Sequence, residues 1–182
     1  MKKTILTFGL ISGAVSSLMM AATVPFMDKI GFDKGLYIGY TAIVLSFLLV
    51  YFGIRSYRDN FGNGQITFAK AFAVGISITL ISCIFYVVTW EVIYFNFMHD
   101  HMDKYGAHVV EKLKASGASA AAVQAKIQEL KEFKVRYENP VFNAAMTFIE
   151  PFPIGLVITL ISAAVLRRKP RSQPAQSPLP AL

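Results

Sequence analysis

The sequence has very little cysteine and little charge for its length. Only one of its 182 residues is cysteine, Cys83, which excludes a scaffold held together by disulfide bonds. Charged residues make up 16% of the chain, whereas an average globular domain contains about 25%. The charges gather in clusters and leave long stretches with none. This pattern argues against a single water-soluble domain and against disorder along most of the chain.

The chain also lacks the short motifs that mark common catalytic and metal sites. It contains no GxSxG elbow, no phosphate-binding P-loop and no GxGxxG motif. The three histidines, His99, His101 and His108, show no HExxH spacing, and there is no CxxC. We therefore expect a non-enzymatic protein with no catalytic residue, metal or cofactor. An external metal site on the histidines and an intramembrane enzyme with an unusual site are the alternatives.

Four long hydrophobic stretches are present, at residues 5–27, 35–54, 71–90 and 143–166. About 20 helical residues are needed to cross a hydrocarbon core of about 30 Å. The only charged residue within the four stretches is Glu150. Strands could cross only as a closed barrel with alternating polarity, which these stretches do not show. The sequence therefore predicts an all-α fold, with a four-helix transmembrane bundle in residues 1–169.

The lysines and arginines predict how the bundle is oriented. At one end nine basic residues face one acid, whereas nine basic and nine acidic residues lie at the other end. Cytoplasmic loops carry an excess of Lys and Arg, so we expect both termini in the cytoplasm. The same excess favours contact with anionic membrane lipid and makes nucleic acid a poor candidate partner.

Residues 92–139 are the only sizeable segment outside these spans. Apolar residues recur there at helical spacing on both sides of Ser116–Ser119, which supplies a glycine typical of a helix end and a serine typical of a helix start. We expect an external helical hairpin whose first helix continues the third span without a break to about Ala115. Residues 170–182 contain four prolines and no periodicity, which predicts a disordered cytoplasmic tail.

Glu150 is the most informative polar residue, because ionisable groups inside a membrane are costly. Pro151 and Pro153 follow it and lack the N–H groups of a helix interior, so we expect the helix to break here and restart at Pro151. Glu150 is then either a structural anchor at a helix N-terminus or an ion-handling group of the kind found at broken transporter helices. Glu91 lies at similar depth, as a second acid of one site or as a separate interfacial residue.

A second polar group lies where the second span ends. Arg55 and Arg58 share one side of the predicted helix, Asp59 can pair with Arg55, and Lys70 lies one turn into the next helix. We expect these residues to anchor a short cytoplasmic loop. Contact with a lipid phosphate or a partner is the alternative.

Small residues recur every four positions in three of the spans, as in Gly9, Gly13, Ser17 and Ala21. Such rows let helices approach closely in lipid. We expect them to pack the bundle within one chain, with a homo-oligomer formed through the first helix as the alternative.

Several stretches resemble one known family. Residues 53–59 (GIRSYRD) and 66–72 (ITFAKAF) are similar to the central signature of domain-of-unknown-function family 4199. Residues 137–140 and 148–155 are similar to its second half, and the resemblance covers roughly residues 4–168. It implies a bacterial cytoplasmic (inner) membrane protein with the same four-helix plan. It implies no activity, cofactor or binding residue.

Two classes of function fit these observations. The first is a non-enzymatic accessory or structural membrane component that binds a protein or lipid partner through the hairpin or the bundle. The second is a small-solute or proton-coupled transporter, or a transporter subunit, that uses Glu150.

Overall fold

The computed structural model describes residues 1–168, and helices make up almost all of that part. Four helical segments are long and apolar enough to cross a membrane, which confirms the predicted fold class. The predicted tail at 170–182 lies outside the described residues. The elements are α1 (Lys2–Thr23), the 3-10 turn η1 (Val24–Phe26), α2 (Met27–Ile30), α3 (Phe32–Phe61), α4 (Phe68–Phe97), α5 (His101–Ala115), α6 (Ala120–Tyr137), α7 (Pro140–Ile149) and α8 (Pro151–Leu166).

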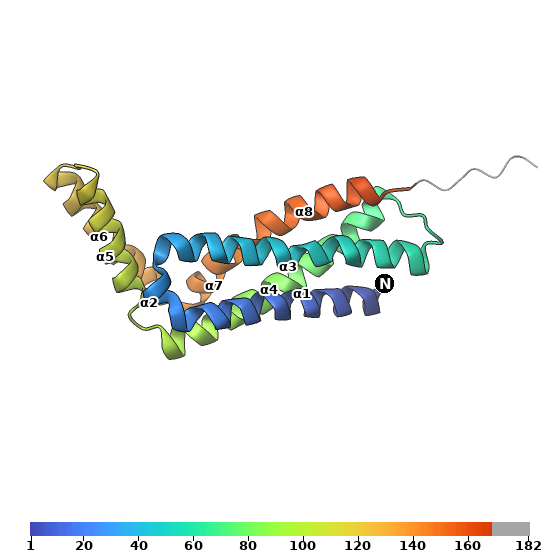
Figure 1. Cartoon of the computed structure of the whole chain (residues 1–182), viewed down its shortest axis with the longest axis horizontal. Coiled ribbons are helices and arrows are strands. Elements are labelled where there is room, and N and C mark those ends of the chain that lie inside the picture. Colours follow the sequence, from blue (N-terminus) through green and yellow to red (C-terminus); the bar gives the residue numbers. More distant parts are fainter. Residues whose placement is uncertain (169–182) are drawn as a thin grey trace, which may run out of the picture.

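The four membrane-length segments lie side by side, as Figure 1 shows. They are α1 with α2, α3, α4, and α7 followed by α8. The α5–α6 hairpin projects from one end, which we call the hairpin end (Figure 1). The opposite end holds the N-terminus, the α3–α4 loop and the end of α8, and we call it the basic end. Its cationic residues in the described chain are Lys2, Lys3, Arg55, Arg58, Lys70, Arg167 and Arg168.

Side-chain hydrogen bonds cap the N-termini of three helices, α4, α6 and α7. The hydroxyl of Thr67 accepts a hydrogen bond from the backbone N–H of Lys70, and that of Ser119 accepts one from Ala122. The side chain of Asn139 accepts from the N–H groups of Val141 and Phe142 at 3.0 and 3.3 Å. These bonds satisfy donors that the first turn of a helix otherwise leaves without a partner.

Close packing at small residues holds the bundle together. A Cβ atom added at Gly13 of α1 would lie 2.6 Å from the Cβ of Phe85 in α4. One added at Gly155 of α8 would clash with Thr79 and would lie 2.9 Å from the ring of Phe47. The rows of small residues therefore bring helices of the same chain together, as expected for packing in lipid.

Buried hydroxyl groups form hydrogen bonds with one another in the middle of the bundle. The hydroxyl of Ser12 in α1 lies 3.0 Å from that of Ser46 in α3 and 3.1 Å from that of Ser82 in α4. Thr79 and Thr159 make a similar contact of 3.0 Å between α4 and α8. In a low-dielectric interior these bonds remove the cost of burying polar groups without partners.

The expectation of one unbroken helix from the third span to about Ala115 is wrong. α4 ends at Phe97, and a short non-helical link leads into α5 at His101. The break allows α5 to turn back over the start of α3, where Phe32 packs against the rings of His101 and Tyr105. Tertiary contacts of this kind redirect a chain even where no proline interrupts it.

Candidate functional site

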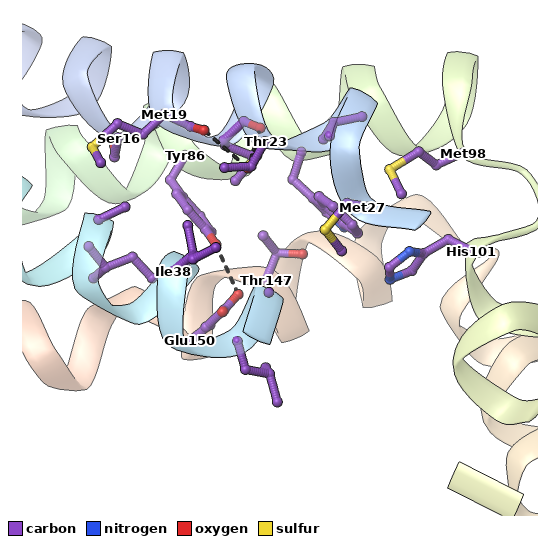
Figure 2. A pocket seen from close by; sticks show the side chains of 18 of the residues that line it. Ser16, Met19, Thr23, Met27, Ile38, Tyr86, Met98, His101, Thr147 and Glu150 are labelled. Atoms are coloured by element: carbon purple, nitrogen blue, oxygen red, sulfur yellow. Dashed lines mark hydrogen bonds between the residues drawn. The ribbon is translucent and has the colours of Figure 1, made fainter. Parts of the chain in front are cut away.

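A cavity of about 340 Å³ lies at the hairpin end, between α1, α3, α4 and α7 (Figure 2). The start of α5 and the end of α6 close it towards the hairpin. Its size falls at the lower end of the range for pockets that bind small molecules. The backbone provides room because the facing positions on α3 are Gly35 and Gly39, and a Cβ added at Gly39 would meet nothing within 4 Å.

The lining is mostly apolar and is rich in methionine. Five of the seven methionines of the chain contribute to it. Methionine side chains are flexible and polarisable, so they adapt to ligands of different shapes. Figure 2 shows three of them, together with Ser16, Thr23, Ile38 and Tyr86, around the cavity. The five are Met19, Met20, Met27, Met98 and Met146.

Glu150 supplies the one acidic group in this lining, which contains no lysine or arginine. α7 ends at Ile149 and α8 begins with Pro151, so the predicted helix break is confirmed. The side chain of Glu150 does not cap α8. Instead, its Oε2 atom accepts a hydrogen bond of 3.1 Å from the hydroxyl of Tyr86 in α4 (Figure 2).

The depth of Glu150 follows from the length of α8. This helix has 16 residues from Pro151 to Leu166. At 1.5 Å per residue it spans about 24 Å, less than a hydrocarbon core of about 30 Å. Glu150 lines the cavity, and we expect its carboxylate to lie several ångströms below the membrane surface at the hairpin end.

An aromatic cluster covers the hairpin side of the cavity. The indole N–H of Trp90 donates a hydrogen bond of 3.0 Å to the hydroxyl of Tyr137, which ties α4 to the end of α6. The rings of Tyr94 and Tyr137 meet edge to face, as do those of Trp90 and His101. Burial lowers the pKa of His101 and raises the pKa of the Tyr137 hydroxyl. Both side chains are therefore neutral near pH 7.

Ion pairs fasten the hairpin beside the mouth of the cavity. Lys104 of α5 donates hydrogen bonds of 3.0 and 3.1 Å to Asp28 of α2. About two turns further along α5, Lys112 donates one of 2.7 Å to Asp33 at the start of α3. A second, more polar cavity of about 510 Å³ lies beneath these pairs. Each pair is solvent-exposed and contributes little on its own.

Glu91 does not belong to this cavity. It is absent from the lining, and its Oε1 atom is buried without a hydrogen-bond partner. Residues 1–168 show no hydrogen bond between Glu91 and Glu150, and of the two carboxylates only that of Glu150 lines the cavity. Residues 1–168 also contain no group of three or more His, Cys, Asp or Glu side chains that could hold a metal ion.

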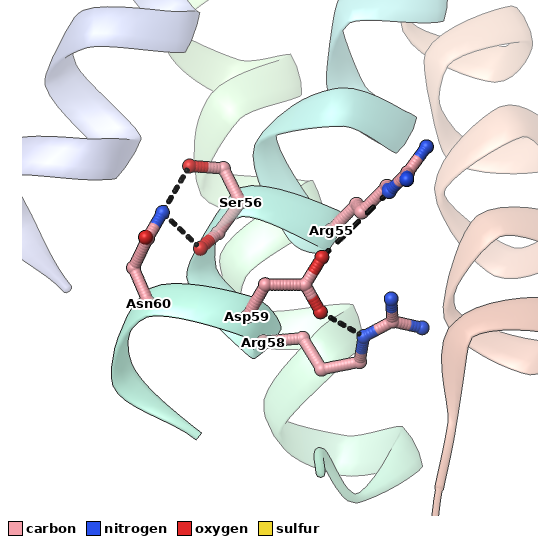
Figure 3. A network of polar contacts seen from close by, with 5 residues as sticks. All are labelled: Arg55, Ser56, Arg58, Asp59 and Asn60. Carbon is pink, nitrogen blue, oxygen red and sulfur yellow. Dashed lines mark hydrogen bonds and ion pairs between the residues drawn. The ribbon is translucent and has the colours of Figure 1, made fainter. Parts of the chain in front are cut away.

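The predicted arginine group lies at the basic end, far from the cavity (Figures 1 and 3). Asp59 accepts a hydrogen bond of 2.7 Å from Arg58 and lies 3.7 Å from Arg55 (Figure 3). The pairing of Arg55 with Asp59 is confirmed, although Arg58 makes the shorter contact. Lys70 lies apart from these three residues and lines a different cavity.

Sequence reasoning found Glu150 but missed its surroundings. Tyr86 and Trp90 belong to apolar or interfacial stretches, where most aromatic side chains only pack. The available signal was the concentration of methionine at positions 19, 20 and 27, together with the spacing of Tyr86 and Trp90 on one face of a helix. Neither signal shows which helices meet, so neither could locate a cavity.

Comparisons with known proteins identify a family and nothing finer. No curated protein and no solved structure gives a significant match to the chain. Residues 7–168 match the model of a protein family described as "Protein of unknown function (DUF4199)". Because this match covers most of the chain and four apolar helices are present, the protein is a membrane protein that belongs to the DUF4199 family.

Proposed function

We propose that this protein is a non-enzymatic membrane component that binds an amphipathic ligand with a cationic group in the cavity at its hairpin end. The observation that carries this proposal is the Glu150 carboxylate within an otherwise uncharged lining. A cation placed beside it would gain a charge partner where water is scarce. The rings of Tyr86 and Trp90 would add cation–π attraction. The methionines would accommodate the apolar part of the ligand.

The proposal includes a location in the membrane. The basic end would face the cytoplasm of a bacterial inner membrane, because basic residues are retained on that side. The hairpin and the cavity would then face outward, and a ligand would enter from the outer leaflet or from the space beyond it. A protein partner, or a second copy of the chain, would contact the exposed surface of the hairpin.

Trp90 allows ligand binding to be measured directly, because it is the only tryptophan and it lines the cavity. The full chain in lipid nanodiscs is titrated with octyltrimethylammonium, and tryptophan fluorescence is followed. We expect a saturable change. Glu150→Gln keeps an acceptor for Tyr86 but removes the charge, so we expect affinity to fall by about tenfold through the loss of charge attraction to the ammonium group.

Two controls separate specific binding from partition into the lipid. Octanol has the same chain length but no charge, and we expect Glu150→Gln to leave its fluorescence response unchanged. Glu91→Gln removes a carboxylate at the same end of the bundle that does not line the cavity, and we expect wild-type affinity for the ammonium compound. An equal loss in both Gln variants, or no saturation in the wild type, would contradict the proposal.

A second candidate function is ion- or proton-coupled transport through Glu150. The specific observation in its favour is a carboxylate at a helix break beside a cavity, as at transporter binding sites. Below the cavity, the space lined by Ser46, Ser82 and Pro151 is too small for a water molecule, so transport requires a second conformation. A proton or ammonium flux in reconstituted vesicles that disappears in Glu150→Gln and persists in Glu91→Gln would favour transport over binding alone.

A further inference from the structure

A separate cavity of about 240 Å³ lies at the basic end, beside the loop that joins α3 to α4. Two cationic side chains, two aromatic rings and two hydroxyl groups line it, and no acidic residue does. These side chains belong to Lys70, Arg168, Tyr57, Phe61 and Thr67. Their mixture of positive charge and apolar surface differs from the lining of the cavity at the hairpin end.

The loop beside this cavity has a well-defined conformation. The backbone N–H of Gln65 donates to the carbonyl of Gly62 at 2.8 Å. Gly64 has a φ of 77°, which glycine adopts without strain. Ile66 and Arg168 exchange two backbone hydrogen bonds of 3.2 and 2.9 Å, which fasten the end of α8 to the loop. Arg168 is thereby held next to the start of α4, although it lies about 100 positions away in the sequence.

The charge of Lys70 has no acidic partner in the chain that the structure describes, and that of Arg168 is balanced only by Coulomb attraction to the nearby Asp59 carboxylate. The one acid at the basic end, Asp59, is hydrogen-bonded to Arg58 at 2.7 Å. Within residues 1–168, neither Lys70 nor Arg168 forms an ion pair. The positive end of the α4 dipole lies beside the same cavity, because α4 begins at Phe68. The cavity therefore combines two cations with a favourable helix dipole.

We propose that this cavity binds the phosphate group of an anionic ligand. Lys70 and Arg168 pair with the phosphate oxygens, and the stacked rings of Tyr57 and Phe61 contact the apolar part of the molecule next to it. The phosphate comes either from an anionic phospholipid, whose headgroups lie at this depth, or from a soluble phosphate ester. Both sources present the same oxygens to the same two side chains.

The test is a binding measurement on the purified full chain in neutral detergent, with native mass spectrometry to count bound molecules. The probes are dioctanoyl phosphatidylglycerol, dioctanoyl phosphatidylcholine and glycerol 3-phosphate. We expect phosphatidylglycerol to bind more tightly than phosphatidylcholine, whose choline group offsets the phosphate charge. We expect Lys70→Gln and Arg168→Gln each to weaken binding of phosphatidylglycerol by about tenfold, since each removes a charged hydrogen-bond donor.

Arg167→Gln is the matched control, because it removes the same charge from the neighbouring position without changing the lining of the cavity. We expect wild-type binding in this variant and also in Arg168→Lys, which keeps a cation. Thermal unfolding of every variant checks that the fold is retained. Equal loss in Arg167→Gln, no loss in Lys70→Gln and Arg168→Gln, or equal binding of the two lipids overturns the proposal.

Competition identifies the source of the phosphate. If glycerol 3-phosphate displaces phosphatidylglycerol at a similar concentration, the ligand is a soluble phosphate ester. If it does not, the ligand is a lipid headgroup whose acyl chains contribute to binding. Both results support phosphate binding at Lys70 and Arg168. None of these binding measurements involves Glu150. A negative result would therefore contradict the phosphate proposal without contradicting the proposed function of the cavity at the hairpin end.

Discussion

At the scale of single residues, the site at the hairpin end depends on groups held in unusual surroundings. The Glu150 carboxylate lies at a helix break below the membrane surface and accepts a hydrogen bond from Tyr86. His101 packs among the rings of Phe32, Trp90 and Tyr94, which shield it from much of the surrounding water. A neutral imidazole fits between these rings, whereas a protonated one would lose hydration without a buried counter-charge. We therefore expect Glu150 to respond to the charge of a bound ligand, and His101 to respond to pH.

The surroundings of His101 predict that the hairpin becomes less stable in acid. Burial is the largest cause of its lowered pKa. Lys104 also lowers the pKa, and Asp100 partly opposes the shift. Because the folded-state pKa lies below the ordinary value of 6.5, protonation favours the undocked hairpin, and stability is lost as the pH falls through 6.5. We expect the thermal midpoint to be lower at pH 5 than at pH 7.5, and His101→Phe to reduce this difference.

His99→Phe is the control for that prediction, because His99 is exposed and packs in none of the aromatic pairs. We expect it to keep the wild-type dependence on pH. If His101→Phe and wild type lose the same stability in acid, burial of this imidazole is not the cause.

At the scale of elements, close helix packing depends on particular glycines rather than on glycine in general. α8 approaches α4 and α3 at Gly155, where an added Cβ would clash with Thr79 and press on the ring of Phe47. We expect Gly155→Ala to lower the stability of the bundle, by roughly 1–3 kcal/mol as for other overpacked cores. Gly39→Ala is the matched control, because its Cβ would meet nothing within 4 Å. Thermal unfolding in detergent measures both.

The two substitutions should differ in their effect on stability, because only Gly155→Ala should lower the thermal midpoint. Alanine is the better helix former, so Gly39→Ala should leave the midpoint unchanged or raise it slightly. A midpoint for Gly155→Ala at or above that of Gly39→Ala would mean that α8 can move away from α4 without cost.

The elements also show how much of this molecule could be predicted from sequence. The break at Glu150 was predictable because it depends only on Pro151 and Pro153, which act on their own helix. The end of α4 at Phe97 was not, because it depends on the contacts of His101 with Phe32 far along the chain. The cavity was not predictable either, since its lining comes from seven helices whose arrangement no local pattern encodes.

At the scale of the whole molecule, the two ends of the bundle differ in chemistry. The hairpin end combines an apolar cavity with a single carboxylate, and the basic end combines cations with aromatic rings. The hydroxyl cluster of Ser12, Ser46 and Ser82 lies between them and closes the interior. We infer that the protein presents two separate binding sites, one at each membrane surface, with no open path between them in this conformation.

The central claim is that the cavity at the hairpin end is open to water from outside the cell and binds a cationic amphiphile beside Glu150. A cysteine placed at Gly39 tests this directly, because the position lines the cavity and has room for a side chain. The native Cys83 is fully buried and serves as an internal blank. Val157→Cys, on the exposed apolar surface of α8, is the lipid-facing control. The measurement is the rate of labelling by a cationic methanethiosulfonate reagent added to intact cells.

We predict that Gly39→Cys is labelled and that Val157→Cys and the wild type are not. Octyltrimethylammonium should slow the labelling of Gly39→Cys, and this protection should be lost when Glu150→Gln is added to the same chain. Absence of labelling at Gly39→Cys, or labelling that octyltrimethylammonium slows equally with and without the Glu150 carboxylate, would contradict the central claim.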